Sequence, residues 1–286
     1  AGTLGLLIPP SIIMIVYGVA AEVSIAQLFI AGVLPGLLLA ALFSGYLMLW
    51  AWRHPALVPP RDPPLPLAAK LRESRHLIPV LLLIAAVLGS IYTGIATATE
   101  AAALGVVGAL VISAAQGSLT WRTFKDSLLG GTRLYCMIAL ILSGAAFLTL
   151  SMGYIGLPRH LAEWIATLGL SQVELLLALM LFYILLGCFL DGISMVVLTM
   201  GVVMPTVQKA GIDPLWFGIF VVIVVEMAQI TPPVGFNLFV MQGMTKRELG
   251  WIARVTFPFF VLMMIAVALI YLLPELVTWL PQQMRR

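Results

Sequence analysis

The stretch from Gln229 to Asn237, Gln-Ile-Thr-Pro-Pro-Val-Gly-Phe-Asn, places two adjacent prolines inside a long apolar segment. Each proline lacks an N–H group and clashes with the carbonyl four residues earlier, so a regular helix cannot continue through this point. A second tandem pair, Pro9 and Pro10, interrupts the first apolar segment in the same way. The two pairs therefore predict two broken helices.

Composition indicates that both breaks lie in a membrane. Hydrophobic residues make up 62% of the 286 positions and charged residues only 9%, whereas soluble domains carry about 25% charged residues. Several apolar runs reach the ~18 residues needed to cross a bilayer, and they lack the alternation of a membrane β-barrel. We predict an all-α membrane protein, a multi-helix bundle with segments near 1–20, 25–50, 77–94, 98–115, 133–152, 174–208, 215–243 and 249–273.

The prolines free four carbonyls from their helical partners: Gly5, Leu6, Ala228 and Gln229. Inside a bilayer these oxygens need another partner, and a dehydrated Na⁺ is suitable because it prefers several oxygen ligands. Thr231 and Asn237 could add side-chain oxygens. A kink satisfied by a neighbouring helix or by water is the alternative, and two matching breaks favour the ion.

The match between the two broken segments extends beyond the breaks. Pro35 follows Pro10 by 25 residues, and Pro258 follows Pro233 by the same interval. Counting membrane crossings, the first broken segment runs outward and the second inward. This pattern predicts inverted repeats with a binding site near the midplane, where the broken helices meet.

Segment 174–208 carries Gly187, Asp191, Gly192 and Ser194 near its middle. About 34 residues is short for two full crossings and a turn, so we favour a re-entrant helical hairpin over two crossings. Just before it, residues 158–168 place apolar side chains on one stripe, which predicts a helix lying in the membrane interface.

Acidic residues in apolar segments are functional candidates. For Asp191 we favour contact with an ion or substrate over helix capping alone. Glu226 is as readily an ion-pair or packing residue as a ligand, and Glu100 is expected to open a helix. Cys136 and Cys188 are expected to be buried thiols without metal-type spacing.

Two functional classes are disfavoured. The basic residues lie in loops without interleaved aromatics, so no nucleic-acid partner is expected, and no catalytic residue is assigned because no nucleophile or metal motif occurs. The proline-rich stretch 53–76 is expected to be a solvated linker, on the cytoplasmic side by the distribution of Lys and Arg. The chain starts inside a membrane segment without a signal peptide, so we expect a fragment.

The chain resembles the large membrane subunit of tripartite ATP-independent periplasmic (TRAP) transporters. Four strings carry the resemblance in the family's order: Gly2 to Ser11, Thr97 to Ala102, Phe189 to Asp191 and Ile230 to Val240. The chain departs from the family at two turns, where Asp191-Gly192-Ile193 replaces Asp-Pro-Thr and Thr97-Ala98-Thr99 replaces Thr-Pro-Thr. Both departures loosen the expected turn geometry.

The resemblance implies two sets of site residues. Ion-binding residues would be Thr3, Gly5 and Pro9 for one sodium site, and Asp191, Ser194, Thr231, Pro232, Gly235 and Asn237 for a second. Substrate-binding residues would be Pro10, Ser11, Gly192 and Pro233. Sodium would be the sole metal, acting as coupling ion, and no other cofactor is implied. The other half of the first site would belong to a hairpin preceding Ala1.

The resemblance also implies an elevator-type secondary transporter of the bacterial inner membrane, which takes up small carboxylates with sodium. Its partners would be a small membrane subunit and a periplasmic substrate-binding protein. Residues 1–52 and 174–286 would form the two repeats of a moving transport domain, 77–152 the fixed scaffold and 153–173 a periplasmic interfacial arm. A sodium/dicarboxylate-type carrier that works without a binding protein is the alternative, and an intramembrane enzyme is disfavoured.

Overall fold

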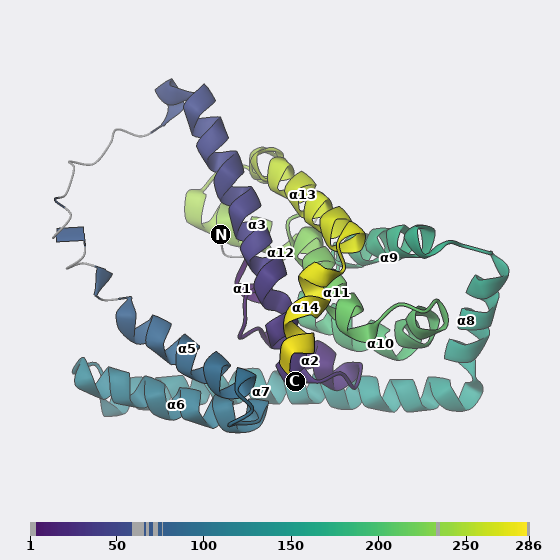
Figure 1. Cartoon of the computed structure of the whole chain (residues 1–286), viewed down its shortest axis with the longest axis horizontal. Helices are drawn as coiled ribbons and strands as arrows, with labels where there is room; N and C mark the ends of the chain where they lie inside the picture. Colours follow the sequence, from purple (N-terminus) through teal and green to yellow (C-terminus); the bar gives the residue numbers. More distant parts are fainter. Residues whose placement is uncertain are drawn as a thin grey trace. The chain divides into compact units, whose positions relative to one another are not determined.

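The structure, a computed structural model of the chain, describes residues 4–58, 66, 69–70, 74–75, 77–232 and 235–284. These residues form helices and no strands (Figure 1), which confirms the all-α class. In chain order the helices are α1 (Leu4–Leu7), α2 (Ile12–Ala20), α3 (Ile25–Arg53), the 3₁₀ turn η1 (Pro55–Leu57), α5 (Ile78–Tyr92), α6 (Ala98–Ala115), α7 (Trp121–Ile155), α8 (Leu157–Thr167), α9 (Gln172–Leu186), α10 (Gly192–Lys209), α11 (Pro214–Gln229), α12 (Phe236–Thr245), α13 (Leu249–Leu272) and α14 (Glu275–Met284).

Membrane-spanning helices are present among the described residues. The helices α3, α6, α7, α10 and α13 are long and apolar enough to cross a bilayer, and α5, α9 and α11 are shorter apolar helices. A helix rises 1.5 Å per residue, so the 24 residues of α13 extend about 36 Å, more than the ~30 Å hydrocarbon core. Length and composition therefore agree with a multi-pass membrane protein.

Both tandem proline pairs interrupt a helix, as predicted. Residues 8–11 separate α1 from α2, and residues 230–235 separate α11 from α12. After each break a short helix, a turn and a long helix follow, and the long helix contains an internal proline, Pro35 in α3 and Pro258 in α13. The succession of elements is thus repeated, while the opposite orientation of the two copies stays a prediction.

The chain divides into two compact units, one made of residues 1–40 and 134–286 and the other of residues 41–133. Helix α11 is the core of the first unit, because every residue from Trp216 to Gln229 is buried. It contacts α1, α2, α9, α10, α12, α13 and α14. A helix that is apolar all round is stable only when other elements cover it on every side.

Segment 174–208 folds as a helical hairpin. Helices α9 and α10 are joined by the turn at 187–191, and their 15 and 18 residues correspond to about 22 and 27 Å. Helix α9 is clearly shorter than the ~30 Å hydrocarbon core, whereas α10 reaches the minimum length of a candidate span. The hairpin itself is therefore present, and its re-entrant placement in the membrane stays a prediction.

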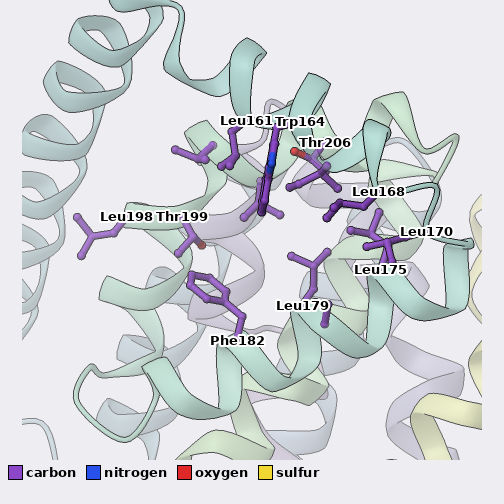
Figure 2. Close-up of a pocket in the computed structure, with 14 residues that line it drawn as sticks. Leu161, Trp164, Leu168, Leu170, Leu175, Leu179, Phe182, Leu198, Thr199 and Thr206 are labelled. Atoms are coloured by element: carbon purple, nitrogen blue, oxygen red, sulfur yellow. The ribbon is translucent and has the colours of Figure 1, made fainter.

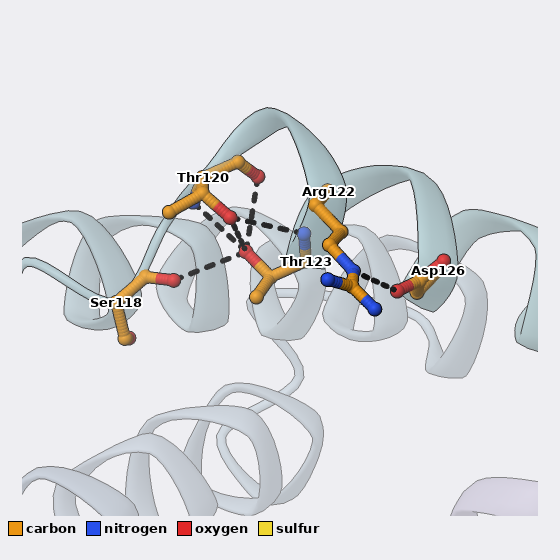
Figure 3. Close-up of polar contacts among 5 residues, drawn as sticks. All are labelled: Ser118, Thr120, Arg122, Thr123 and Asp126. Carbon is orange, nitrogen blue, oxygen red and sulfur yellow. Dashed lines mark hydrogen bonds and ion pairs between the residues drawn. The ribbon is translucent and has the colours of Figure 1, made fainter.

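The segment expected near 133–152 starts too late, because α7 begins at Trp121. Its start is capped reciprocally (Figure 3): the amide of Thr120 donates to the hydroxyl of Thr123 at 2.8 Å, and the amide of Thr123 donates to the hydroxyl of Thr120 at 3.1 Å. Arg122 and Asp126 form an exposed ion pair at 3.9 Å on the first turns. Hydropathy missed these turns because they are helical but polar. It missed α14 because this helix has only ten residues and mixes apolar with polar side chains, so it contains no long apolar run.

The smaller expectations had mixed outcomes. Glu100 opens α6 in a capping box with Thr97, as expected. Cys188 is buried, but Cys136 is exposed, because a membrane helix can turn an apolar residue away from the rest of the chain. In the linker, residues 59–65, 67–68, 71–73 and 76 lie outside the described residues.

Helix α8 forms where an interfacial helix was expected. Its apolar stripe faces the hairpin, and α8 packs against α10 (Figure 1). The predicted division into transport domain, scaffold and arm is a division by movement, so the compact units do not test it.

The close approach of the hairpin to α11 generates a stability prediction. A Cβ atom on Gly187 would lie 2.3 Å from the Cβ of Ala228, although its helical backbone conformation admits any residue. We expect Gly187→Ala to lower the free energy of unfolding by about 1–3 kcal/mol through overpacking.

Gly243→Ala is the matched control for this substitution. Gly243 lies in α12 with nothing within 4 Å of an added Cβ, so alanine there should leave stability unchanged or raise it by about 0.5–1 kcal/mol. Unfolding of the detergent-solubilised full-length protein measures both. Equal stability of Gly187→Ala and wild type would contradict the packing described.

Candidate ion and substrate site

The turn that joins α9 to α10 meets the second helix break. The thiol of Cys188 lies 3.5 Å from the carbonyl oxygen of Pro232. A Cβ atom on Gly192 would lie 2.6 Å from the amide nitrogen of the Gln229 side chain and 3.0 Å from a methyl carbon of Ile13. The structure therefore brings the hairpin turn together with the end of α11 and the start of α2.

Asp191 is the N-cap of α10. One carboxylate oxygen accepts hydrogen bonds from the backbone amides of Ile193 at 3.0 Å and Ser194 at 3.2 Å. The other accepts the hydroxyl of Ser194. The capping role, which we had ranked second, is thus what the structure shows, and contact with an ion stays a prediction.

At the second break, two side chains make hydrogen bonds to residues of α11. The hydroxyl of Thr231 donates to the carbonyl of Met227 at 2.7 Å. The side-chain amide of Asn237 donates to the side-chain oxygen of Gln229 at 3.1 Å, across the break. Pro233 lies outside the described residues.

Gly235 permits two carbonyls to converge. An added Cβ there would lie 2.8 Å from the carbonyl oxygen of Thr231 and 2.9 Å from that of Gln229. Only glycine allows the backbone to approach both oxygens so closely. Carbonyl oxygens gathered in this way suit a cation.

At both breaks, protein groups bond to some of the carbonyls that the prolines free. At the first break, the hydroxyl of Ser11 donates to the freed carbonyl of Leu6. At the second, the backbone amide of Thr231 donates to the freed carbonyl of Ala228 at 3.1 Å. These two carbonyls therefore have partners, contrary to our expectation. Among the described residues no hydrogen bond reaches the carbonyls of Gly5 and Gln229.

Ser11 also caps α2 by accepting from the amide of Met14 at 3.4 Å. It is buried, as is Pro9, whereas Gly5 and Pro10 are exposed. Thr3 lies outside the described residues. The structure thus gives Ser11 a structural role, and its assignment to the substrate stays a prediction.

The hydrogen bonds leave acceptors unused. The protons of the Ser194 and Thr231 hydroxyls and one proton of the Asn237 side-chain amide point to protein acceptors. Within the described residues, the lone pairs of these hydroxyl oxygens and the side-chain oxygen of Asn237 are therefore left to bind a positive charge. With one carboxylate and several neutral oxygens, this donor set fits a hard monovalent cation.

Two side chains at this site were missed or underrated from sequence. Gln229 was considered only for its carbonyl, yet its side chain joins the hairpin to α12. Glu226 is fully buried in α11, and neither carboxylate oxygen has a hydrogen-bond partner among the described residues. An unpaired carboxylate is very costly in such a place, so a proton or a cation must neutralise it. The polar spacing of Glu226 and Gln229 on a buried helix was the available signal.

Capping by Asp191 predicts a difference between two substitutions. Asp191→Ala should lower the free energy of unfolding by about 0.5–2 kcal/mol, because the amides of Ile193 and Ser194 lose the carboxylate that accepts their hydrogen bonds. Asp191→Asn should leave it nearly unchanged, since asparagine caps helices as well as aspartate does. Unfolding in detergent compares them, and equal losses in both variants would contradict a capping role.

The chain is similar in sequence to known membrane transport proteins. Residues 1–276 match the family described as Tripartite ATP-independent periplasmic transporter, DctM component. The C4-dicarboxylate TRAP transporter large permease protein DctM of Pseudomonas aeruginosa is 34% identical over 288 residues, covering 98% of this chain and 65% of that protein.

Other relatives carry different names. The isethionate TRAP transporter permease protein DctMQ of Oleidesulfovibrio alaskensis is 30% identical, over 92% of this chain and 41% of its own length. The ectoine/5-hydroxyectoine TRAP transporter large permease protein UehC of Ruegeria pomeroyi is 32% identical, over 95% and 63%.

The chain covers 65% of the length of the Pseudomonas relative. The relatives are named as permease subunits and not as enzymes. Together with the apolar spans, the match to nearly the whole chain identifies a multi-pass protein of the inner membrane. The chain belongs to the DctM component family of tripartite ATP-independent periplasmic transporters.

Proposed function

We propose that this chain forms the substrate pathway of a sodium-coupled TRAP transporter and works by an elevator movement. The observation that carries the proposal is the meeting of the hairpin turn with the second helix break. There the Asp191 turn and the oxygens of Thr231, Gly235 and Asn237 belong to one small region of the first unit. Sodium would bind these oxygens and complete their coordination.

The position of the proposed ligands explains why sodium binding would be coupled to the arrangement of the helices. The donors come from the hairpin, from the end of α11 and from the start of α12, so a cation bound to all of them would hold three elements together. An empty site would leave the carbonyl of Gln229 and the unused lone pairs of the other oxygens without a partner, which is costly in an apolar environment. Ion binding would thus stabilise the closed arrangement that receives the substrate.

The energy available is sufficient for uptake. Each net positive charge carried inward gains about 2.3 kcal/mol per 100 mV of membrane potential. Two net charges would support accumulation on the order of a thousandfold, since about 1.36 kcal/mol corresponds to a tenfold ratio. The sodium gradient would add to this.

The names of the relatives support a substrate class. C4-dicarboxylate proteins are among them, and we propose a small carboxylate for this chain, delivered by a periplasmic binding protein and with a small membrane subunit as partner. The names of other relatives show that the family also accommodates isethionate and ectoine. A carrier without a binding protein is the alternative function.

The ion site predicts a sodium effect that is separate from helix capping. Asp191→Asn keeps the cap but removes the charge, so we expect the sodium concentration for half-maximal uptake to rise at least tenfold. Asp213→Asn is the matched control, because Asp213 caps α11 through the amide of Leu215 at 2.9 Å and lies outside the site. Uptake of labelled dicarboxylate by full-length protein in proteoliposomes measures both. An unchanged half-maximal sodium concentration in Asp191→Asn would contradict the proposal that the charge of Asp191 binds sodium.

A second pair tests the hydroxyl of Thr231. Thr231→Val should strongly raise the sodium concentration needed for half-maximal uptake, whereas Thr245→Val should leave it unchanged. Both hydroxyls donate to the carbonyl four residues earlier at 2.7 Å, so the pair is matched in its helix bond. Equal behaviour of the two variants would exclude Thr231 as a ligand.

Omitting components of the same assay distinguishes the two transport functions. Without sodium, uptake should stop, and without the periplasmic binding protein it should also stop. Uptake that persists without the binding protein would favour the alternative carrier, and uptake that persists without sodium would overturn the coupling.

A further inference from the structure

A cavity of about 450 Å³ lies between α8 and the hairpin α9–α10. Figure 2 shows Leu161, Trp164 and Leu168 on one side and Leu179 and Phe182 on the other. The lining is almost wholly apolar. Trp164 and Leu168 are 58% and 50% exposed, so the cavity is open to the surroundings of the helices along one side.

Thr206 interrupts this apolar lining. Its side chain is only 5% exposed, and its hydroxyl has no hydrogen-bond partner among the described residues. The other hydroxyl in the cavity, that of Thr199, is already bonded to Tyr183 at 2.8 Å. A buried hydroxyl without a partner is unusual and calls for an acceptor from outside the chain.

Thr206 also lines a second cavity, of about 210 Å³, which reaches Lys209 at the end of α10. Lys209 follows Thr206 by one helical turn, about 4.5 Å along the axis. Along one face of α10, the two cavities therefore present an apolar region, then a free hydroxyl, then an ammonium group.

After the larger effect of Arg159, the nearby ammonium group of Lys209 also contributes its charge to the lowered pKa of the Glu163 carboxyl. Arg159 on α8 donates to Glu163 at 2.9 Å, and this hydrogen bond lowers the pKa of the Glu163 carboxyl, so these two groups remain paired. Within the described part of the chain no carboxylate lies within 4.0 Å of Lys209. An anionic group could therefore bind there.

We infer that the α8–hairpin cavity binds one glycerophospholipid, with an acyl chain in the apolar part, an ester carbonyl accepting from Thr206 and the phosphate at Lys209. The order of apolar, hydroxyl and cationic groups matches the order of groups along such a lipid. A phospholipid satisfies all three at once, which a purely apolar protein segment would not. Its acyl chain would lie between α8 and the hairpin and limit their relative movement. The inference is independent of sodium coupling.

The first test is native mass spectrometry of the full-length transporter complex released from phosphatidylglycerol nanodiscs. Wild type should retain one phosphatidylglycerol per chain at this site. We expect Lys209→Gln and Ala178→Phe, which fills the cavity, to lower retention at least fivefold, and Thr206→Val to lower it severalfold with its shape preserved. Lys246→Gln is the control, because Lys246 is exposed at the end of α12 and lines neither cavity.

Folding failure of one variant would not decide the outcome. Lys209 is exposed, and its substitution leaves the packing intact, so this variant remains informative if Ala178→Phe does not fold. Retention by Lys209→Gln and Thr206→Val equal to wild type would overturn the site.

The second test locates the acyl chain. Phosphatidylglycerol with brominated acyl chains should quench the fluorescence of Trp164, seen as a quenched component of wild type that disappears in Trp164→Phe and is reduced in Lys209→Gln. Quenching that is identical in wild type and Trp164→Phe would place the lipid elsewhere. A cavity filled by a protein segment would give the same negative result and would also overturn the proposal.

Discussion

A backbone carbonyl in an apolar environment must have a partner, and the tandem prolines remove partners at two places in this chain. The protein repairs part of the loss itself, with the Ser11 hydroxyl at Leu6 and the Thr231 amide at Ala228. Among the described residues the carbonyls of Gly5 and Gln229 stay without a partner, and that of Gln229 lies beside Gly235, close to the carbonyl of Thr231, which accepts the Gly235 amide at 3.1 Å. The rest of the first unit is arranged around this region.

Helix α11 carries that region because it is buried on every side. Its burial requires close neighbours, and the hairpin can approach only where side chains are minimal, at Gly187 and Gly192. The packing that stabilises α11 is therefore the same packing that brings the Asp191 turn to the break. Stability and the geometry of the site have one physical cause.

Capping and ion binding are compatible at Asp191. The carboxylate accepts three hydrogen bonds from its own turn, which fixes its position and the start of α10. The hydroxyl of Ser194 gives its proton to the carboxylate and keeps its lone pairs. A capped helix start can thus present acceptors to a cation, so the capping that the structure shows does not exclude the ion contact that we predict.

Periodicity and hydropathy could locate most helices, since burial in a membrane demands long apolar runs. They missed the first turns of α7, which carry charged side chains, and all of α14, which is too short and too mixed in composition to form an apolar run. They also placed Cys136 inside, because an apolar sequence does not say whether a side chain meets protein or the surroundings.

The sequence by itself determined that the chain is helical, where two helices break and which residues carry oxygen at the breaks, because these follow from local covalent chemistry. Only the tertiary structure decided which freed carbonyls are satisfied, that Gln229 joins the hairpin to α12, and that α8 and α10 enclose a cavity with a free hydroxyl. These depend on contacts between residues far apart in the chain, which no local pattern encodes.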